Sequence, residues 1–230
     1  MELVHAPVTE LRQLLTESFE DWAQEGRSCA LSGGATALIF LPALRAAKVD
    51  WSKITLFWTD ERAVPADDPE SNYGIADRML LSPLGARAPR AIRMPADLPS
   101  LGDAALKYDD VLSTELRGGP LDLVLLGVGE DGHVASLFPG HPALAQDDLR
   151  AVAVEDAPRA PKRRLSLTFR YVLQARKIWL IAVGPRKLPV LQAALSKTQR
   201  STPLDLLLHQ AKDITVFTDQ VIRRTDRRRT

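Results

Sequence analysis

The stretch that decides the fold spans Leu121–His141 and has the sequence LDLVLLGVGEDGHVASLFPGH. Its first half is an apolar run, which is typical of a parallel strand buried on both faces of a sheet. Glycines end the run, and Asp131 and His133 follow within a few residues. In open α/β sheets, ligands bind beyond the carboxyl ends of such strands. The stretch therefore predicts a parallel sheet with a titratable cluster at its ligand-binding edge, an arrangement that indicates an enzyme.

Apolar segments alternate with amphipathic segments along the rest of the chain. Strands are expected at Ser28–Leu31, Ile54–Trp58, Leu121–Val128, Arg164–Phe169, Lys177–Val183 and Asp213–Thr218, and helices at Val8–Glu25, Thr36–Ala47, Ser71–Leu81, Leu101–Leu116, Arg186–Leu195 and Pro203–His209. This alternation predicts a three-layer α/β/α sandwich with a mainly parallel, Rossmann-like, doubly wound sheet. We expect residues 1–230 to form one domain, with a loop-rich rim between Pro139 and Pro161.

The composition bounds the class of protein. The chain has 230 residues, of which 45% are hydrophobic, enough to bury a substantial core. Lysine plus arginine (30) nearly balances aspartate plus glutamate (29), so no overall field favours nucleic acid or an anionic membrane, and the basic run Arg223–Arg229 is interpreted as a solvated tail. The single cysteine, Cys29, excludes an intrachain disulfide, and no signal-peptide or membrane-spanning pattern is present. We therefore expect a cytoplasmic monomer without nucleic-acid or membrane partners.

The segment Gly127–Gly132 also satisfies the G-x-G-x-x-G pattern, so an oxidoreductase that uses NAD or NADP is a competing interpretation. That pattern requires its third glycine to open a helix whose amino terminus holds the pyrophosphate. Pro139 and Pro142 would cut such a helix short, and Glu130 and Asp131 would place negative charge beside the phosphates. We therefore favour a sharp turn over a dinucleotide site and expect no cofactor.

The same turn brings Asp131 close to His133 in the sequence. Histidine, with an ordinary pKa of about 6.5, is the side chain best suited to accept a proton near neutral pH. A neighbouring carboxylate fixes the tautomer of the imidazole and stabilises its protonated form. We predict a general base at His133 oriented by Asp131, and a purely structural hydrogen-bonded pair remains the alternative. With His141 these residues complete no familiar ligand spacing, so we expect no metal.

A second glycine turn has the composition of a phosphate cradle. In the sequence SGGAT, Gly33 and Gly34 follow a predicted strand, and a predicted helix begins at Thr36. Glycines let backbone N–H groups approach an anion, and the helix adds the positive end of its dipole. Three cations near predicted strand ends are candidates to complete the site, namely Arg62, Arg164 and Lys187. Taken alone, the turn is equally compatible with an ordinary strand-to-helix connection.

Three segments form a combined pattern: the glycine turn Ser32–Thr36, a block made of Asp60–Arg62 with Ser71 and Asn72, and the signature Gly127–Pro139. Over nearly the whole chain this pattern resembles the 6-phosphogluconolactonase family. The related glucosamine-6-phosphate deaminases share the glycine turn, the Asp-Glu pair and Gly-x-Gly-x-Asp-Gly-His, but their pattern continues toward Phe-Asn-Glu-Pro. This chain continues VASLFP and has Arg62 where the deaminases carry an aromatic residue. These differences favour the lactonases.

The resemblance implies an enzyme that hydrolyses 6-phospho-D-glucono-1,5-lactone to 6-phospho-D-gluconate, the second step of the oxidative pentose phosphate pathway. It implies catalysis by His133 and Asp131, and binding of the sugar phosphate by Gly33, Gly34, Thr36, Arg62, Asn72, Arg164 and Lys187. The group that stabilises the oxyanion is left unassigned, with N–H groups around Gly129 and Gly132 as candidates. A deaminase-like isomerase and a non-catalytic sugar-phosphate sensor remain as alternatives.

Overall fold

A computed structural model describes residues 1–196 and 201–222, which contain two β-sheets. The larger sheet consists, in spatial order, of β1 (Glu2–His5), β10 (Ile214–Thr218), β9 (Lys177–Ala182), β6 (Leu123–Gly127), β2 (Ser28–Leu31), β3 (Thr55–Trp58) and β5 (Arg90–Ala91). Each neighbouring pair in it is parallel. The smaller sheet is antiparallel and consists of β4 (Asp60–Arg62), β8 (Arg164–Leu167) and β7 (Ala151–Val154).

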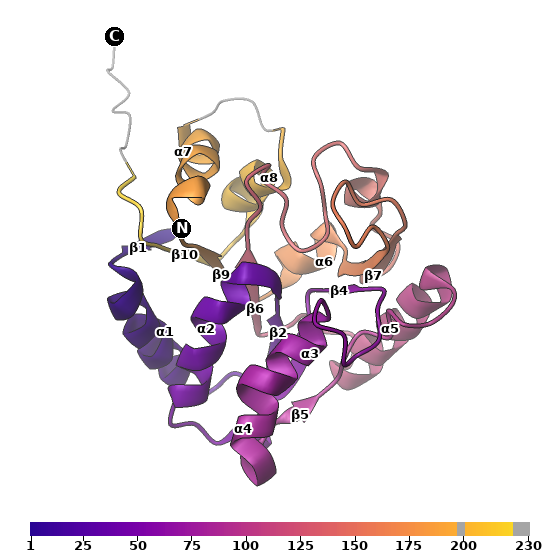
Figure 1. Ribbon diagram of the computed structural model, residues 1–230, viewed down its shortest axis with the longest axis horizontal. Coiled ribbons are helices and arrows are strands. Elements are labelled where there is room, and N and C mark those ends of the chain that lie inside the picture. The colour runs from indigo at the N-terminus through magenta and orange to yellow at the C-terminus, as the bar shows by residue number, and fades with distance from the viewer. Residues whose placement is uncertain (197–200, 223–230) are drawn as a thin grey trace.

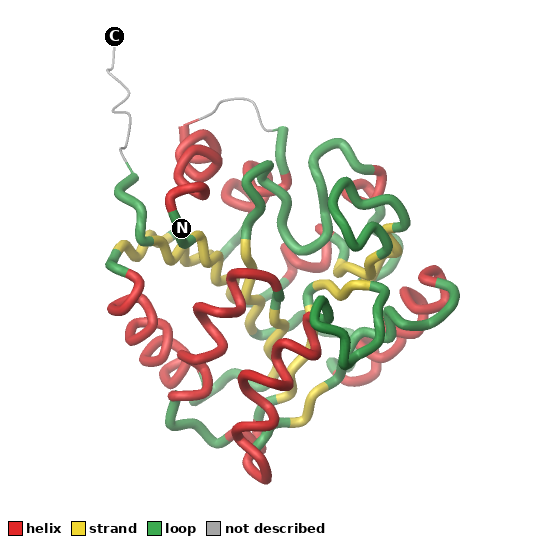
Figure 2. The backbone as a smooth tube through the Cα atoms, viewed as in Figure 1, coloured by secondary structure: helices red, strands yellow, loops and turns green. Residues whose placement is uncertain are grey.

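Helices cover both faces of the larger sheet (Figures 1 and 2). One layer holds α1 (Val8–Trp22), α2 (Gly34–Ala46), α3 (Asn72–Ala76), which continues into a π-helical turn over Asp77–Leu81, and α4 (Ser82–Leu84). The other holds α5 (Leu101–Glu115), α6 (Phe169–Gln174), α7 (Leu188–Ser196) and α8 (Pro203–Gln210). Four short 3-10 turns complete the elements, at Trp51–Lys53, Gly85–Arg87, Pro142–Ala145 and Pro185–Lys187. The predicted three-layer, doubly wound α/β/α sandwich is confirmed.

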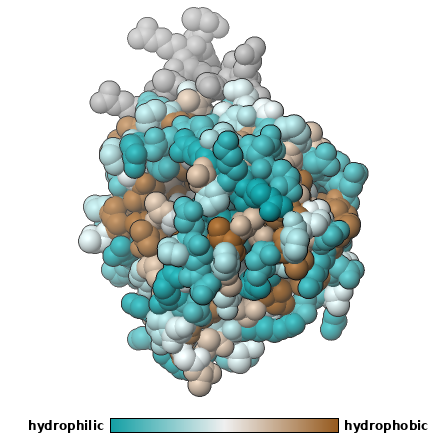
Figure 3. Space-filling model, turned by 45° about the vertical axis from the view of Figure 1, so that its right-hand side comes forward, coloured by the Kyte–Doolittle hydropathy of each residue, from teal (hydrophilic) through white to brown (hydrophobic). Residues whose placement is uncertain are grey.

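The hydrophobic pattern explains why these segments fold as they do. In α1, Leu11, Leu15 and Phe19 recur every four residues and are buried, so one face of the helix packs on the sheet. In β6, the four residues Leu123–Leu126 are all buried, as expected for a strand covered by helices on both faces. The surface in turn is largely hydrophilic on the face that Figure 3 shows.

The order of the strands fixes where a ligand would bind. The chain moves from β1 to β2, β3 and β5 in one direction across the sheet, and from β6 to β9 and β10 in the other. Direction therefore reverses between β2 and β6, which lie side by side in parallel. At such a switch point the connections after the two strands diverge to opposite faces and leave a crevice. The turn at Gly33 follows β2 and the turn before His133 follows β6, so both predicted motifs meet there.

Two expectations need correction. The segment between Pro139 and Pro161 is more than a loop-rich rim, because it contains β7, which pairs with β8. The strand predicted at Arg164–Phe169 exists as β8, but it belongs to the small antiparallel sheet. Strands β1, β4 and β5 were not predicted, since they are too short or too polar to give a strand pattern. The basic run Arg223–Arg229 lies outside the described residues, and among those described no helix is long and apolar enough to cross a membrane.

Candidate active site

A cavity of about 150 Å³ lies at the switch point between β2 and β6. Eight of the nine residues predicted for the site line it: Gly33, Gly34, Thr36, Arg62, Asn72, His133, Arg164 and Lys187. The ninth, Asp131, contacts the ring of His133 from the side. The cations of the predicted phosphate cradle and the imidazole therefore face one cavity, although they come from segments far apart in the chain.

Asp131 holds the imidazole of His133 through one of its ring nitrogens. The Nδ1 atom of His133 lies 2.5 Å from Oδ1 of Asp131, which leaves Nε2 as the nitrogen that can accept a proton. Gly129 makes the pair possible, because a Cβ at that position would lie 2.0 Å from Nδ1. The imidazole also packs against the ring of Phe138, with centroids 4.5 Å apart. The pair is therefore fixed by close packing on two sides.

The electrostatic surroundings favour a neutral imidazole and an ionised carboxylate. Burial lowers the pKa of His133, and the charge and hydrogen bond of Asp131 only partly oppose this effect. Burial by itself would raise the pKa of Asp131, but the interactions with His133 and the charge of Arg159 outweigh it and lower that pKa. Near neutral pH, His133 is thus free to take up a proton.

The glycine turn after β2 is shaped to let an anion approach. Gly34 has φ +64°, in the left-handed region that favours glycine, and it is the first residue of α2. Gly33 has no room for a side chain, since a Cβ there would lie 1.8 Å from Oδ1 of Asn72. The first N–H groups of α2 and the positive end of its dipole therefore face the cavity without side chains in the way.

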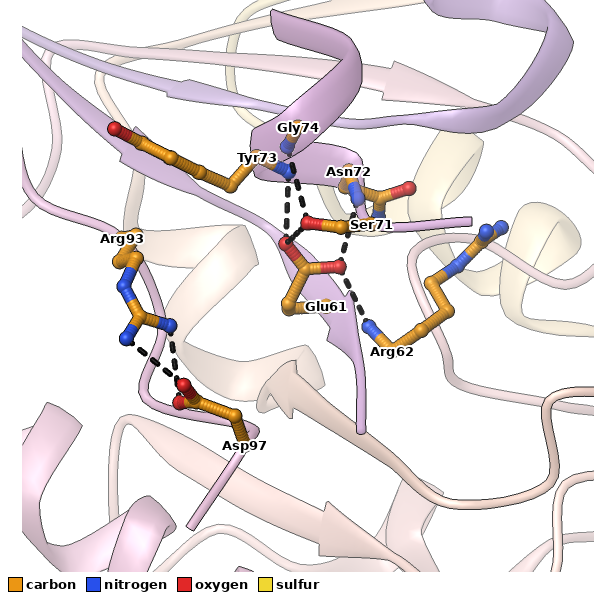
Figure 4. A network of polar contacts seen from close by, with 8 residues as sticks. All are labelled: Glu61, Arg62, Ser71, Asn72, Tyr73, Gly74, Arg93 and Asp97. Atoms are coloured by element: carbon orange, nitrogen blue, oxygen red, sulfur yellow. Dashed lines mark hydrogen bonds and ion pairs between the residues drawn. The ribbon is translucent and has the colours of Figure 1, made fainter. Parts of the chain in front are cut away.

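A buried carboxylate organises the block that carries Arg62 and Asn72 (Figure 4). One oxygen of Glu61 accepts hydrogen bonds from the backbone N–H groups of Arg62 and Asn72, both at 2.7 Å. The other accepts from the N–H of Tyr73 at 2.7 Å and from the hydroxyl of Ser71 at 3.1 Å. Burial raises the pKa of Glu61, while these hydrogen bonds to its charged form oppose the shift. Glu61 thus joins β4 to the start of α3 and sets the position of both site residues.

The three predicted cations differ in how they are held. Arg62 donates from Nη1 to the carbonyl of Glu70 at 2.9 Å, and its buried Nε has no hydrogen-bond partner among the described residues. Arg164 is buried and donates to the carbonyls of residues 159–161. Burial lowers the pKa of Lys187, and none of the ion pairs between described residues involves its ammonium group. Arg62 and Lys187 are thus the freer donors, and Arg164 is a fixed charge.

The N–H groups proposed for the oxyanion are already in use. The N–H of Gly129 donates to the carbonyl of His133 at 2.9 Å, and the N–H of Gly132 donates to the carbonyl of Gly129 at 3.0 Å. These bonds close the tight turn that brings the imidazole over Asp131. These two N–H groups are therefore not available to stabilise an oxyanion.

Sequence reasoning missed three residues of the site. Asp60 and Arg159 line the cavity, and Ser136 contacts Asp60 and Arg164 just beneath it. Asp60 had a usable signal, since it stands two residues before Arg62 and alternate residues of a strand share a face. Ser136 lies within the signature Gly127–Pro139, but nothing local indicates its contact with Asp60, and Arg159 had no signal, because long-range packing of their loops brings both to the site.

The geometry also bears on cofactors and metals. After Gly132 the chain continues through a turn, and the next helical element is the short 3-10 segment Pro142–Ala145, so the G-x-G-x-x-G match lacks the helix that a pyrophosphate needs. The described part of the chain contains no group of three or more His, Cys, Asp or Glu side chains arranged to hold a metal ion. The residues of the cavity support acid–base chemistry on an anionic substrate.

Comparison with known proteins supplies the family. A family model described as glucosamine-6-phosphate isomerases/6-phosphogluconolactonase matches residues 2–216. The chain belongs to this family. A curated 6-phosphogluconolactonase of Pseudomonas putida is 40% identical over 198 residues, which cover 84% of this chain and 80% of that protein. Another, of Mycobacterium tuberculosis, is 38% identical over 175 residues, which cover 72% and 71%.

Solved structures agree with this assignment. A 6-phosphogluconolactonase from Shewanella baltica superposes with a TM-score of 0.85 at 28% identity and covers 95% of this chain and 97% of that one. A monomeric glucosamine-6-phosphate deaminase superposes with a TM-score of 0.79, but at 19% identity it shares the fold alone. Since the curated relatives named above are lactonases, this chain is an enzyme of the lactonase branch of the family.

Proposed function

We propose that this chain hydrolyses 6-phospho-D-glucono-1,5-lactone to 6-phospho-D-gluconate, with His133 as the general base. One observation carries the proposal: a single cavity is lined by Arg62, Arg164 and Lys187, which form no ion pair with another described residue, and by an imidazole whose Nδ1 is held by a carboxylate. A phosphorylated sugar lactone offers a group for each, namely a dianion for the cations and an electrophilic carbonyl for a base-activated water.

The phosphate binds at the cations of the cavity that form no ion pair with another described residue. Arg62, Lys187 and the amino terminus of α2 at Gly34 provide charge-assisted hydrogen bonds, and the buried guanidinium of Arg164 adds a fixed positive charge. Binding at this end orients the six-membered ring so that its carbonyl carbon faces His133. The phosphate thus contributes to catalysis through positioning, because its binding holds the carbonyl carbon in a reactive orientation beside His133.

Hydrolysis proceeds in two proton transfers through the same nitrogen. Water attacks C1 of the lactone while Nε2 of His133 removes its proton, and Asp131 stabilises the imidazolium that forms. The tetrahedral intermediate then collapses, the bond from C1 to the ring oxygen breaks, and the imidazolium returns the proton to that oxygen. The free carboxylic acid ionises and releases one proton to the solvent. No covalent bond to the enzyme is needed.

The setting of this reaction is part of the proposal. The product is the substrate of the next oxidation in the oxidative pentose phosphate pathway, so we assign the chain to the second step of that pathway in the cytoplasm. We also propose that residues 1–230 act as a single domain, since one cluster of buried hydrophobic residues extends through the described part of the chain, and that the enzyme is a monomer.

Two other functions are separated from this one by a direct assay. A pH-stat measurement on fresh lactone, corrected for spontaneous ring opening, is expected to show acid release in proportion to enzyme concentration. A deaminase-like isomerase would instead release ammonia from glucosamine 6-phosphate. A sensor would bind 6-phosphogluconate and release no acid from the lactone. Acid release no faster than the spontaneous rate would therefore overturn the proposal.

A further inference from the structure

One buried hydroxyl lies between the two charges at the base of the cavity. Ser136 is fully buried, and its Oγ donates a hydrogen bond to Oδ2 of Asp60 at 2.7 Å. The same oxygen accepts a longer one from Nη1 of Arg164, at 3.4 Å. Asp60 and Arg164 are themselves buried, and none of the ion pairs formed by the described residues joins them. The carboxylate and the guanidinium are thus separated by a single hydroxyl group.

The donors of Arg164 are almost all in use. Its Nε donates to the carbonyl of Pro161 at 2.7 Å, and Nη2 donates to the carbonyls of Arg159 and Ala160 at 3.1 and 3.3 Å. With the bond from Nη1 to Ser136, four of the five N–H groups of the guanidinium are occupied. One N–H on Nη1 remains, on the atom that contacts Ser136. This N–H is the one that Arg164 can offer to a ligand in the cavity that it lines.

Asp60 is the group that would compete for this N–H. Its Oδ1 accepts from Thr59 and Asn72, both at 3.3 Å, whereas Oδ2 has Ser136 as its donor. Without that hydroxyl, a buried carboxylate oxygen would lose its short hydrogen bond, which is costly unless another donor replaces it. Among the cations that line the cavity, Arg164 is the one already attached to the same hydroxyl. If the guanidinium shifted toward Asp60, its remaining N–H would bind the carboxylate and would no longer be available to a ligand.

We propose that Ser136 is a positioning residue, whose hydroxyl keeps Asp60 from pairing directly with Arg164 and so keeps the last guanidinium N–H available to the phosphate of the substrate. The inference deepens the proposed function and rests on it for the role of Arg164. Without Ser136, Asp60 would compete with the phosphate for Arg164. Neutralising Asp60 is therefore expected to restore the phosphate binding that is lost with Ser136.

The test measures binding of 6-phosphogluconate by calorimetry to the wild type and to four variants. Ser136→Ala is expected to weaken binding about tenfold, the loss of one charge-assisted hydrogen bond. Adding Asp60→Asn to that variant is expected to restore most of the affinity, and Asp60→Asn alone completes the cycle. Ser166→Ala is the matched control, because Ser166 is equally buried and contacts the N–H of Ser136, but its hydroxyl touches neither charge. It is expected to bind like the wild type.

Each result decides for or against the inference. Unchanged affinity in Ser136→Ala, failure of Asp60→Asn to restore it, or an equal loss in Ser166→Ala would each overturn it. If Ser136→Ala does not fold, Ser136→Cys takes its place, since a thiol fits the site and is a weak donor. Failure of the proposed function looks different: the wild type would then hydrolyse no lactone, whatever the pattern of binding across the variants.

Discussion

Two hollows lie at opposite ends of the parallel sheet, and the smaller one has the chemistry of a site. The hollow at the amino ends of the strands has a volume of about 770 Å³, against about 150 Å³ for the cavity at the carboxyl ends. Two ion pairs lie around the larger hollow: Asp122 contacts Arg176 at 3.2 Å, and Lys177 contacts Asp213 at 3.6 Å. Four cations line the smaller cavity, and among the described residues only Arg159 forms an ion pair, with Asp131 at 3.7 Å.

The proposed site is therefore distinguished by cations that form no ion pair with another described residue, and not by its volume. Like charges held close together destabilise a fold unless a ligand neutralises them, so their presence calls for an anion. In the small sheet, Arg62 and Arg164 stand directly opposite each other on β4 and β8. At the amino-end hollow, by contrast, Arg176 and Lys177 each lie beside an aspartate.

The largest effect is expected from the base itself. His133→Gln removes the proton acceptor and is expected to lower kcat by about 10²-fold or more, while the affinity for 6-phosphogluconate stays near that of the wild type. The matched control is His141→Gln, because His141 also pairs with an aspartate, Asp156 at 2.8 Å, but lies outside the cavity. Steady-state kinetics and calorimetry measure the two quantities. Near-normal turnover in His133→Gln would exclude this residue as the base.

A smaller effect is expected from a lysine that has a counterpart at the other end of the same strand. Lys187 follows β9 and lines the cavity, whereas Lys177 begins β9 and pairs with Asp213. Lys187→Met is expected to raise KM about tenfold with little change in kcat, because it removes one charge-assisted contact to the phosphate. Lys177→Met is expected to leave both constants unchanged. Equal changes in KM in the two variants would contradict the assignment of Lys187, and not Lys177, to the phosphate site.

The sequence predicted contacts between residues that are close along the chain or that follow adjacent strands, and it missed a contact between distant segments. Asp131 and His133 are two residues apart, and the glycines around them fix their contact, so the pair was predictable. Gly33 and the signature loop follow adjacent strands, and the βαβ pattern was enough to bring them to one crevice. The contact of Ser136 with Asp60 spans 76 residues and depends on a small antiparallel sheet whose strands have three or four residues. Strand β4, with three residues, is too short to give a strand pattern, so the contact of Ser136 with Asp60 was missed although Arg164 was predicted.

The pH dependence of activity is expected to change less than the constants above, but with a defined sign. Because burial lowers the pKa of His133 below its ordinary value of 6.5, the acidic limb of kcat/KM should have its midpoint below pH 6.5. Arg159→Gln removes a positive charge that lowers this pKa and should move the limb to higher pH. Asp131→Asn removes a negative charge that raises it and should move the limb to lower pH. Shifts in the same direction in both variants would contradict this electrostatic account.

The same pKa shift has a consequence for stability. The folded state disfavours the protonated imidazole, so between the folded pKa and 6.5 the unfolded chain binds more protons. The contribution of His133 to the free energy of unfolding is therefore complete above pH 6.5 and is lost as the pH falls below that value. Urea titrations of the wild type and His133→Gln across this range measure it, and the variant is expected to show a weaker dependence on pH.

The smallest effect on catalysis is expected at the amino end, where a change should affect stability alone. One oxygen of Asp122 accepts from the backbone N–H groups of Arg27 and Ser28 at 3.0 and 2.9 Å, and the other pairs with Arg176. Asp122→Asn is expected to lower the free energy of unfolding by about 1–2 kcal/mol, because these hydrogen bonds lose their charged acceptor. Its kcat/KM is expected to equal that of the wild type, because the residue lies at the opposite end of β6 from His133. A fall in kcat/KM without loss of folded protein would mean that the larger hollow takes part in the reaction, and that paired charges there do not mark an inert surface.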